Sequence, residues 1–285
     1  MKIGFIGLGV MGESMCENIV KKHDDVVYVF DVVPEKTAKL AALGAAGCPS
    51  NLALAEKSDV IITMVPRSEH LTGVYDEILP AIDETKICID MSTVDPSVSV
   101  ATAKRVEARG GRFADCPVVK SKPAAIAGTL GIYAGCSEAL FEEIRPILLY
   151  MGCNVKRMGD VGSGITMKIC HNALVAQIQN GVNETLALAC KCGISPGDFA
   201  EAISYGGGQN FYLDGQWRNL AAENWETAFS MENMHKDLGI CMALSEEKGF
   251  PMPGAANAKA VYDEGIQKGL GKLDFRATYK IVKER

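Results

Sequence analysis

The sequence predicts an α/β protein in two parts, a doubly wound parallel sheet followed by an all-helical domain, with a long helix connecting them. Up to about residue 160, short apolar runs alternate with helical stretches, and this alternation requires crossovers in a mainly parallel sheet. After residue 164 the apolar residues fall at helical spacing, and no convincing strand follows Arg157. We therefore expect two domains, residues 1–161 and 162–285.

The expected strands are short and apolar: Ile3–Ile6, Val26–Phe30, Val60–Met64, Ile87–Asp90, Arg112–Ala114, Thr129–Ala134 and Asn154–Arg157. Helices fit between them, for example at Ser97–Arg109 and Ser137–Met151. The long helix is expected from Gly164 to about Cys190, a length of about 40 Å. Later helices are expected at Pro196–Ser204, Met231–Glu247 and Ala255–Lys268.

The first strand runs directly into Gly7-x-Gly9-x-x-Gly12, and a helical stretch follows. Gly7 permits a tight turn, Gly9 lets the backbone approach a pyrophosphate, and Gly12 lets the helix pack on the strand. The free N–H groups at the start of the helix suit the phosphates. This context predicts an N-terminal Rossmann dinucleotide-binding domain.

A single acid, Asp31, follows the second strand, 19 residues after Gly12. At this spacing a carboxylate can accept hydrogen bonds from the 2′-hydroxyl of the adenosine ribose, and it repels a 2′-phosphate. The next residues, Val32, Val33 and Pro34, include no cation to bind such a phosphate. We therefore expect NAD rather than NADP.

Composition excludes several classes of function. The content of 48% hydrophobic and 22% charged residues is ordinary for a globular enzyme, and the net charge of −6 provides no basic field for nucleic acid or an anionic membrane. No apolar run approaches the roughly 20 residues of a membrane span. Ten cysteines without a CxxC pair or a secretory signal predict free thiols in a reducing cytoplasm, and the four histidines show no metal-ligand spacing.

The long helix carries a second group of interest. Gly162-Ser-Gly164 precedes it, and Lys168 and Asn172 lie four residues apart, hence on one face. A lysine beside an amide suits carbonyl chemistry, because the ammonium can hydrogen-bond a substrate oxygen while the amide orients it. The spacing alone leaves open a solvated lysine on an ordinary helix.

Together these motifs resemble the β-hydroxyacid dehydrogenase family, whose members include 3-hydroxyisobutyrate dehydrogenase, tartronate semialdehyde reductase and sulfolactaldehyde reductase. The resemblance covers essentially the whole chain. It is carried by five segments: Gly4–Gly12, Ile89–Thr93 with Pro96, Asp115–Val118 with Ala127–Leu130, Gly162–Asn172 and His235–Leu238.

The resemblance implies roles for individual residues. Lys168 would be catalytic, with Asn172 as its partner. Cofactor contacts would come from Gly7, Gly9, Val10, Met11, Gly12, Asp31, Val65, Pro66, Thr93 and Lys236. Taking the resemblance and the residues themselves together, we expect substrate contacts from Ser92, Val119, Lys120, Ser121, Asn172, Lys236 and Asp237. The resemblance also implies a homodimer or homotetramer formed through the helical domains.

One loop departs from the family pattern. The family's Ser-Gly-Gly, which holds a substrate carboxylate, is here Val119-Lys120-Ser121. A lysine supplies a flexible point charge suited to a larger or more charged anion. Sulfolactaldehyde reductases also place a basic residue near this position. The alternative is that Lys120 merely faces solvent.

These patterns predict an NAD-dependent oxidoreductase that interconverts a short, anionic β-hydroxy acid and its aldehyde. The best single substrate is 3-sulfolactaldehyde, and semialdehydes of the 3-hydroxyisobutyrate, tartronate or succinate type are the alternative. A non-catalytic NAD-binding sensor would not need Lys168 with Asn172. Imine reductases of related architecture usually lack the lysine.

Overall fold

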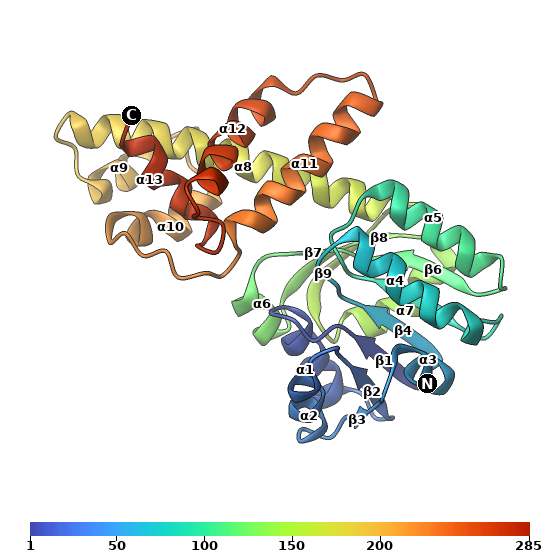
Figure 1. Ribbon diagram of the computed structural model, residues 1–285. Coiled ribbons are helices and arrows are strands. Elements are labelled where there is room, and N and C mark those ends of the chain that lie inside the picture. Colours follow the sequence, from blue (N-terminus) through green and yellow to red (C-terminus); the bar gives the residue numbers. More distant parts are fainter. The chain divides into compact units, whose positions relative to one another are not determined.

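The computed structural model describes residues 1–285 and divides into two compact units, Met1–Lys168 and Ile169–Arg285. The division falls inside helix α8 (Ser163–Lys191), whereas the boundary expected from the sequence lies just before this helix (Figure 1). Each unit has its own hydrophobic core.

The first unit is built on a nine-stranded sheet with the order β3-β2-β1-β4-β5-β6-β8-β7, and β9 pairs with β8. All pairs are parallel except β6 with β8 and β7 with β8. The strands are β1 (Ile3–Ile6), β2 (Val27–Phe30), β3 (Ala46–Gly47), β4 (Val60–Thr63), β5 (Ile87–Asp90), β6 (Arg112–Asp115), β7 (Val118–Val119), β8 (Leu130–Gly135) and β9 (Gly152–Gly159).

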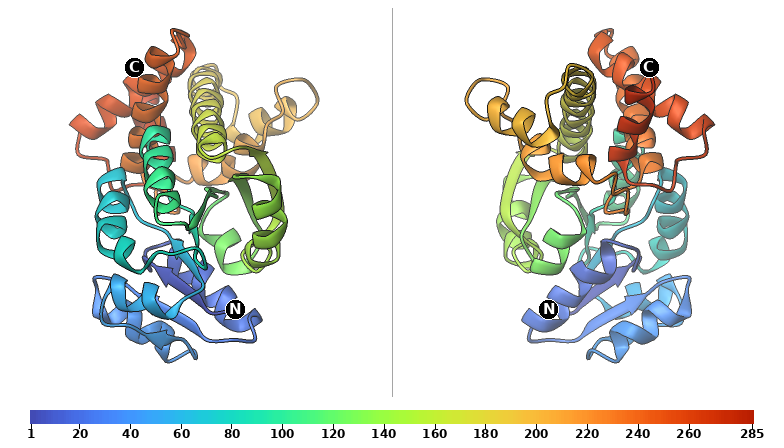
Figure 2. Two further views of the ribbon diagram at one scale, coloured as in Figure 1. Left: turned by 90° about the vertical axis from the view of Figure 1, so that its right-hand side faces the viewer. Right: turned by 90° about the vertical axis from the view of Figure 1, so that its left-hand side faces the viewer.

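Helices cover both faces of this sheet, as the strand–helix alternation predicted. They are α1 (Gly12–Lys22), α2 (Pro34–Ala41), α3 (Asn51–Lys57), α4 (Ser68–Ile78), the short η1 (Leu79–Ala81), α5 (Pro96–Glu107), α6 (Lys122–Ala127) and α7 (Glu138–Leu148). Helices α1, α2, α6 and α7 pack on one face and α3, α4 and α5 on the other; Figure 2 shows helices on opposite sides of the sheet.

The central strands β1, β4 and β5 are mainly apolar on both sides because both of their faces are buried. In β4, Val60 and Ile62 point into one core and Ile61 into the other, and β5 alternates in the same way. Such strands contain runs of three or four apolar residues, which is why β1, β4 and β5 were recognisable from the sequence.

Two short strands were not expected. β3 and β7 each contain only two residues, too few for a hydrophobic pattern, and their existence depends on pairing with β2 and β8. The second of these includes Val119, which we expected in a loop; it is a buried strand residue, and its predicted contact with a substrate stays a prediction.

The second unit is helical. Its helices are the later part of α8, α9 (Pro196–Ile203), α10 (Phe211–Ala221), α11 (Met231–Glu247), α12 (Pro253–Gln267), the short η2 (Phe275–Ala277) and α13 (Thr278–Lys283). Their core surrounds Val182 and Leu186 of α8. Helices α10 and α13 were not expected from the sequence. The first contains Gly215 and exposes Phe211 at its start, and the second is a six-residue segment with β-branched residues.

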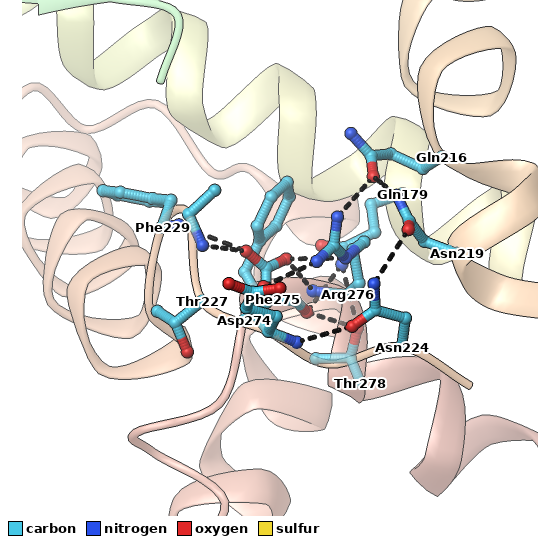
Figure 3. A network of polar contacts seen from close by, with 12 residues as sticks. Gln179, Gln216, Asn219, Asn224, Thr227, Phe229, Asp274, Phe275, Arg276 and Thr278 are labelled. Atoms are coloured by element: carbon cyan, nitrogen blue, oxygen red, sulfur yellow. Dashed lines mark hydrogen bonds and ion pairs between the residues drawn. The ribbon is translucent and has the colours of Figure 1, made fainter. Parts of the chain in front are cut away.

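A buried polar network holds the C-terminal segment of this unit in place (Figure 3). Asp274 accepts hydrogen bonds from the backbone N–H groups of Ala228 and Phe229, and it forms an ion pair with Arg276 at 3.0 Å. The Arg276 guanidinium also donates to Gln216 Oε1 at 2.6 Å and to the Glu226 carbonyl at 2.7 Å. The segment after α12 is thereby tied to α10 and to the loop before α11.

All ten cysteines are free thiols, six of them buried. No group of histidine, cysteine and acidic side chains has an arrangement that could hold a metal ion. None of the helices combines the length and the apolar character that crossing a bilayer requires.

Candidate active site

The glycine loop after β1 has the geometry of a dinucleotide site. Gly7 adopts φ +94°, and a Cβ there would lie 2.3 Å from the Met64 carbonyl oxygen. A Cβ on Gly12 would lie 2.0 Å from the Gly7 oxygen, so only glycine lets α1 begin this close to the loop. At Gly9 a Cβ would meet no protein atom within 4 Å, which leaves that side open to a ligand. These residues fit a pyrophosphate at the start of α1.

Val10 and Met11 complete this loop. The Val10 side chain is exposed, and Met11 stands at the N-cap of α1 with no side-chain hydrogen bond to the helix. Because the first turn is not capped by a side chain, its backbone N–H groups are suited to an anion.

Asp31 follows β2, and its carboxylate is fixed within the first unit. Oδ2 accepts from the Leu8 N–H at 2.7 Å, and Oδ1 accepts from the Val33 N–H at 2.9 Å. The acid is thus tied to the glycine loop itself. Lys36 Nζ lies 3.6 Å from Oδ1. This cation, in the first turn of α2, was not expected, because only Val32, Val33 and Pro34 were considered from the sequence.

A polar network joins the ends of β4 and β5. Asp90 Oδ1 accepts from the Thr63 hydroxyl at 2.8 Å and from the Ser92 hydroxyl at 2.6 Å, and Ser92 Oγ accepts from the Val65 N–H at 2.9 Å. Ser92 is buried, and its hydroxyl proton is donated to Asp90 within the first unit. Its predicted contact with a substrate stays a prediction, whereas its role in fixing the loop at Val65 is a direct observation.

Pro66 lies in the loop after β4 and is exposed, and Thr93 lies in the loop after β5 and is half-buried. Gly7, Asp31, Val65 and Thr93 follow β1, β2, β4 and β5, which are parallel neighbours. The predicted cofactor residues of this unit therefore share the carboxyl edge of the sheet, where ligands bind in folds of this kind.

Lys168 and Asn172 lie one turn apart on α8, and both are buried, with 7% and 5% of their surface exposed. A solvated lysine on an ordinary helix would be largely exposed. That alternative is therefore wrong for Lys168. Cys170, by contrast, is exposed, and His171 is half-buried, as residues off this face are expected to be.

The second unit supplies a partner for Asn172. Its Nδ2 donates to Asp237 Oδ2 at 2.6 Å, and Lys236 Nζ lies 3.3 Å from Asp237 Oδ1. Three residues that the sequence analysis assigned to the site, Asn172, Lys236 and Asp237, thus meet in one cluster. The preceding His235 belongs to a different contact, with Asp263 at 2.6 Å.

The loop that replaces Ser-Gly-Gly is distinctive. Lys120 adopts φ +77°, a left-handed conformation that glycine adopts more easily than a residue with a Cβ. The Lys120 ammonium donates to the Thr129 carbonyl at 2.7 Å in its own unit, and Ser121 stands half-buried at the start of α6 without capping it. In this structure Lys120 therefore contacts the neighbouring loop.

One buried acid near the site was not singled out from the sequence. Asp115, the last residue of β6, accepts hydrogen bonds from the backbone N–H groups of Gly162 and Ile165, both at 2.7 Å. Burial raises the pKa of Asp115 to about 7, and these two hydrogen bonds work in the opposite direction. Its only signal in the sequence is its place in the Asp115–Val118 segment, because the contact joins residues about 50 positions apart.

Comparisons with known proteins agree with this geometry. A family model described as the NAD binding domain of 6-phosphogluconate dehydrogenase matches residues 2–159. A second, described as NAD-binding of NADP-dependent 3-hydroxyisobutyrate dehydrogenase, matches residues 162–282. Together they define a two-domain, nicotinamide-dependent dehydrogenase.

Individual relatives cover the whole chain. It is 34% identical to a 2-(hydroxymethyl)glutarate dehydrogenase of Eubacterium barkeri, over 99% of this chain and 94% of that one. It is also 34% identical to glyoxylate/succinic semialdehyde reductase 1 of Arabidopsis thaliana, over 99% of both. Among solved structures, 3-hydroxyisobutyrate dehydrogenase of Mycobacterium tuberculosis with L-serine matches with a TM-score of 0.91 and 28% identity over 99% of each chain.

The chain therefore belongs to the β-hydroxyacid dehydrogenase family, and it is an NAD(P)-dependent oxidoreductase that acts on CH–OH groups. This result confirms the family and the enzyme class predicted from the motifs, and it disfavours a non-catalytic sensor. The names of the relatives support hydroxyacid and semialdehyde chemistry, but they do not support sulfolactaldehyde in particular.

Proposed function

We propose that this enzyme uses NAD to interconvert a short, anionic β-hydroxy acid and its aldehyde, with Lys168 as the acid–base residue and Asn172 as its partner. The observation that carries the proposal is the burial of both side chains, one turn apart on α8. Burying an ammonium costs free energy, and groups buried in this way are concentrated at sites that need a charge or a proton.

The proposed mechanism assigns the proton to Lys168. When bound, the nicotinamide supplies or accepts the hydride. In the reducing direction the Lys168 ammonium stabilises the negative charge that develops on the carbonyl oxygen and then protonates it. In oxidation, neutral Lys168 accepts the hydroxyl proton. Asn172, whose Nδ2 is held by Asp237, presents its Oδ1 as the remaining acceptor.

For the substrate we propose a small carboxylate semialdehyde of the kind that the relatives' names indicate. The second candidate is 3-sulfolactaldehyde, favoured by Val119-Lys120-Ser121 in place of Ser-Gly-Gly. Lys120 would have to leave the Thr129 carbonyl to bind a sulfonate. Turnover of both aldehyde classes by the wild type and Lys120→Ala distinguishes them, because only a sulfonate held by Lys120 loses its advantage in the variant.

We also propose NAD rather than NADP as the preferred cofactor, since Asp31 lies where it would repel a 2′-phosphate. A homodimer or homotetramer is supported by apolar residues of the helical unit that are exposed in the single chain, such as Leu188 at 64% and Phe211 at 89%. Light scattering on the wild type and Leu188→Glu tests this assembly. A cytoplasmic location is supported by the ten free thiols and is tested by cell fractionation.

The experiment that tests the proposed function is the Lys168→Ala variant, assayed for NADH oxidation with a panel of short anionic aldehydes. We expect kcat to fall by about 10²–10⁴-fold while NADH still binds. Lys191→Ala, at the exposed end of the same helix, is the matched control and should turn over normally. Near-normal turnover by Lys168→Ala would refute the proposal.

A further inference from the structure

A single buried carboxylate connects the sheet to the helix that carries Lys168. Asp115 is the last residue of β6, and only 1% of its surface is exposed. Oδ1 accepts from the Gly162 N–H and Oδ2 from the Ile165 N–H, each at 2.7 Å. These two donors lie in the first turn of α8 or just before it, where backbone N–H groups have no partner within the helix.

Two attachment points restrict a helix more than one does. Each residue of an α-helix advances about 1.5 Å and turns by about 100°, so a slip of one residue would move Lys168 to another face. Lys168 follows Ile165 by only three residues, and no flexible segment separates them. The carboxylate therefore fixes the position of the first turn along the helix axis and its rotation about that axis. Both determine where the Lys168 ammonium lies. Above the Asp115 pKa of about 7, the charge of the carboxylate also suits the positive end of the helix dipole.

Glycines around Asp115 show that this contact is closely packed. A Cβ on Gly164 would lie 2.5 Å from the Tyr133 oxygen and 2.7 Å from the Asp115 backbone oxygen. A Cβ on Gly135 would lie 2.3 Å from Asp115 Oδ1. Gly162, which donates one of the hydrogen bonds to the Asp115 carboxylate, adopts φ +93°, a conformation in which a residue with a Cβ would be strained. The Gly162-x-Gly164 segment thus has a physical explanation in the approach of α8 to β6 and β8.

We propose that Asp115 is a positioning residue for catalysis: by holding the first turn of α8 against the end of β6, it places the Lys168 ammonium for proton transfer. The inference rests on the proposed function of Lys168. In this role Asp115 acts only through α8 and contacts neither cofactor nor substrate, so its loss should affect kcat and leave binding unchanged.

The first test is the Asp115→Asn variant. An asparagine can accept from only one of the two N–H groups, and its own NH₂ group opposes the other, so the helix start must shift. We expect kcat to fall by about 10–100-fold, the loss typical of a small misplacement, with KM and the NADH dissociation constant within about twofold of the wild type. Ser137→Ala, which removes the cap of α7 in the same unit, is the matched control and should leave kcat unchanged.

A double-mutant cycle decides whether Asp115 acts through Lys168. In a Lys168→Ala background, turnover is measured with ethylamine added to replace the missing ammonium, since a free amine does not depend on the position of the helix. We expect Asp115→Asn to reduce this rescued rate by less than about twofold. An equal loss in both backgrounds would show that Asp115 acts independently and would overturn the inference.

The two proposals fail in different ways. Near-normal turnover by Lys168→Ala removes the proposed function whatever Asp115 does. Loss of turnover in Lys168→Ala together with normal kcat in Asp115→Asn removes only the positioning role. Should Asp115→Asn fail to fold, Gly164→Ala tests the same contact, because it displaces the helix start but keeps the carboxylate. The same cycle applies to it, and a normal kcat in folded Gly164→Ala would overturn the inference.

Discussion

The side-chain amide of Asn172 donates a hydrogen bond of 2.6 Å to the carboxylate of Asp237, and both residues are buried. The bond fixes which end of the amide points away from Asp237, and it links α8 with α11. Asp237 also pairs with Lys236, so one carboxylate organises two residues predicted to serve the site.

Replacing Asn172 by aspartate should make the helical unit sensitive to pH. Asn172→Asp places two buried carboxylates within hydrogen-bonding distance, and their repulsion is on the order of 4 kcal/mol when both are ionised. A proton shared at acidic pH relieves it. We therefore expect the variant to be less stable than the wild type above neutral pH and to recover as the pH falls toward about 5.

The two tryptophans, Trp217 and Trp225, both lie in the second unit, so fluorescence-detected urea unfolding follows this unit specifically. Asn172→Ala is the control, since it removes the donor without adding a charge. A stability difference between the two variants that did not change with pH would contradict the expected repulsion.

Lys36 should limit the preference for NADH over NADPH. Its ammonium lies 3.6 Å from Asp31 Oδ1 and offers a partner to a 2′-phosphate that Asp31 alone would repel. We expect Lys36→Ala to raise the ratio of kcat/KM for NADH to that for NADPH by about 3–10-fold, the effect of one exposed charge of about 1 kcal/mol. Lys39→Ala, on the same helix but paired with Glu13, is the control. A ratio unchanged by Lys36→Ala would show that Lys36 does not face the ribose.

Lys120 should be strained at its backbone. At φ +77° a residue with a Cβ costs about 1 kcal/mol relative to glycine. Lys120→Ala and Lys120→Gly both lose the hydrogen bond to Thr129, but only the second relieves the strain. We expect Lys120→Gly to be the more stable of the two by about 1 kcal/mol in thermal unfolding. Equal stabilities would show that the loop relaxes to another conformation in the variants.

Much of this fold could be predicted from local patterns. β1, β4 and β5 each contain a run of three or four apolar residues, and Met231–Glu247 was predicted at its observed limits because its apolar residues repeat at helical spacing. β7 could not be predicted, because two residues carry no period and form a strand only by pairing with β8. α10 contains a glycine and exposes its first aromatic residue, so its pattern was weak.

The candidate site divides in the same way. The glycine loop, Asp31 and the pair Lys168 and Asn172 follow from spacings within one element or between consecutive ones. The partners of these residues do not. Asp237 lies 65 residues from Asn172, and Asp115 lies 47 residues from Gly162. Only the fold brings such side chains together. Asp237 and the Asp115–Val118 segment were noticed through the family resemblance alone, and no local spacing pairs them with Asn172 or Gly162.

The contribution of Asp115 to the free energy of unfolding should fall as the pH rises. Burial raises its pKa from 3.8 to about 7 in the folded state, while in the unfolded chain the group titrates near its ordinary value. Between these limits the folded protein keeps a proton that the unfolded chain has released. This group's contribution to the free energy of unfolding therefore falls by about 1.4 kcal/mol per pH unit between about pH 4 and 7 and is constant above.

Calorimetric unfolding of the wild type and Asp115→Asn across this range checks the sign. As the pH is lowered from about 7 to about 5, the free energy of unfolding of the wild type should rise relative to that of the variant, because asparagine does not titrate. Parallel stability profiles would indicate that the hydrogen bonds from Gly162 and Ile165 outweigh burial and keep the carboxylate ionised.

Removing the guanidinium of Arg276 should destabilise the helical unit without touching the site. Arg276 is buried against Asp274 and supplies hydrogen bonds to Gln216 and Glu226, so Arg276→Ala leaves a buried carboxylate without its counter-charge (Figure 3). Loss of one partner of a buried pair costs about 3–5 kcal/mol. Arg218→Ala is the control, since Arg218 is exposed and only covers the Trp217 ring, a contact worth about 1 kcal/mol. Urea unfolding followed by tryptophan fluorescence measures both, and a loss below about 1 kcal/mol in Arg276→Ala would show that the backbone N–H groups around Asp274 suffice to hold the C-terminal segment.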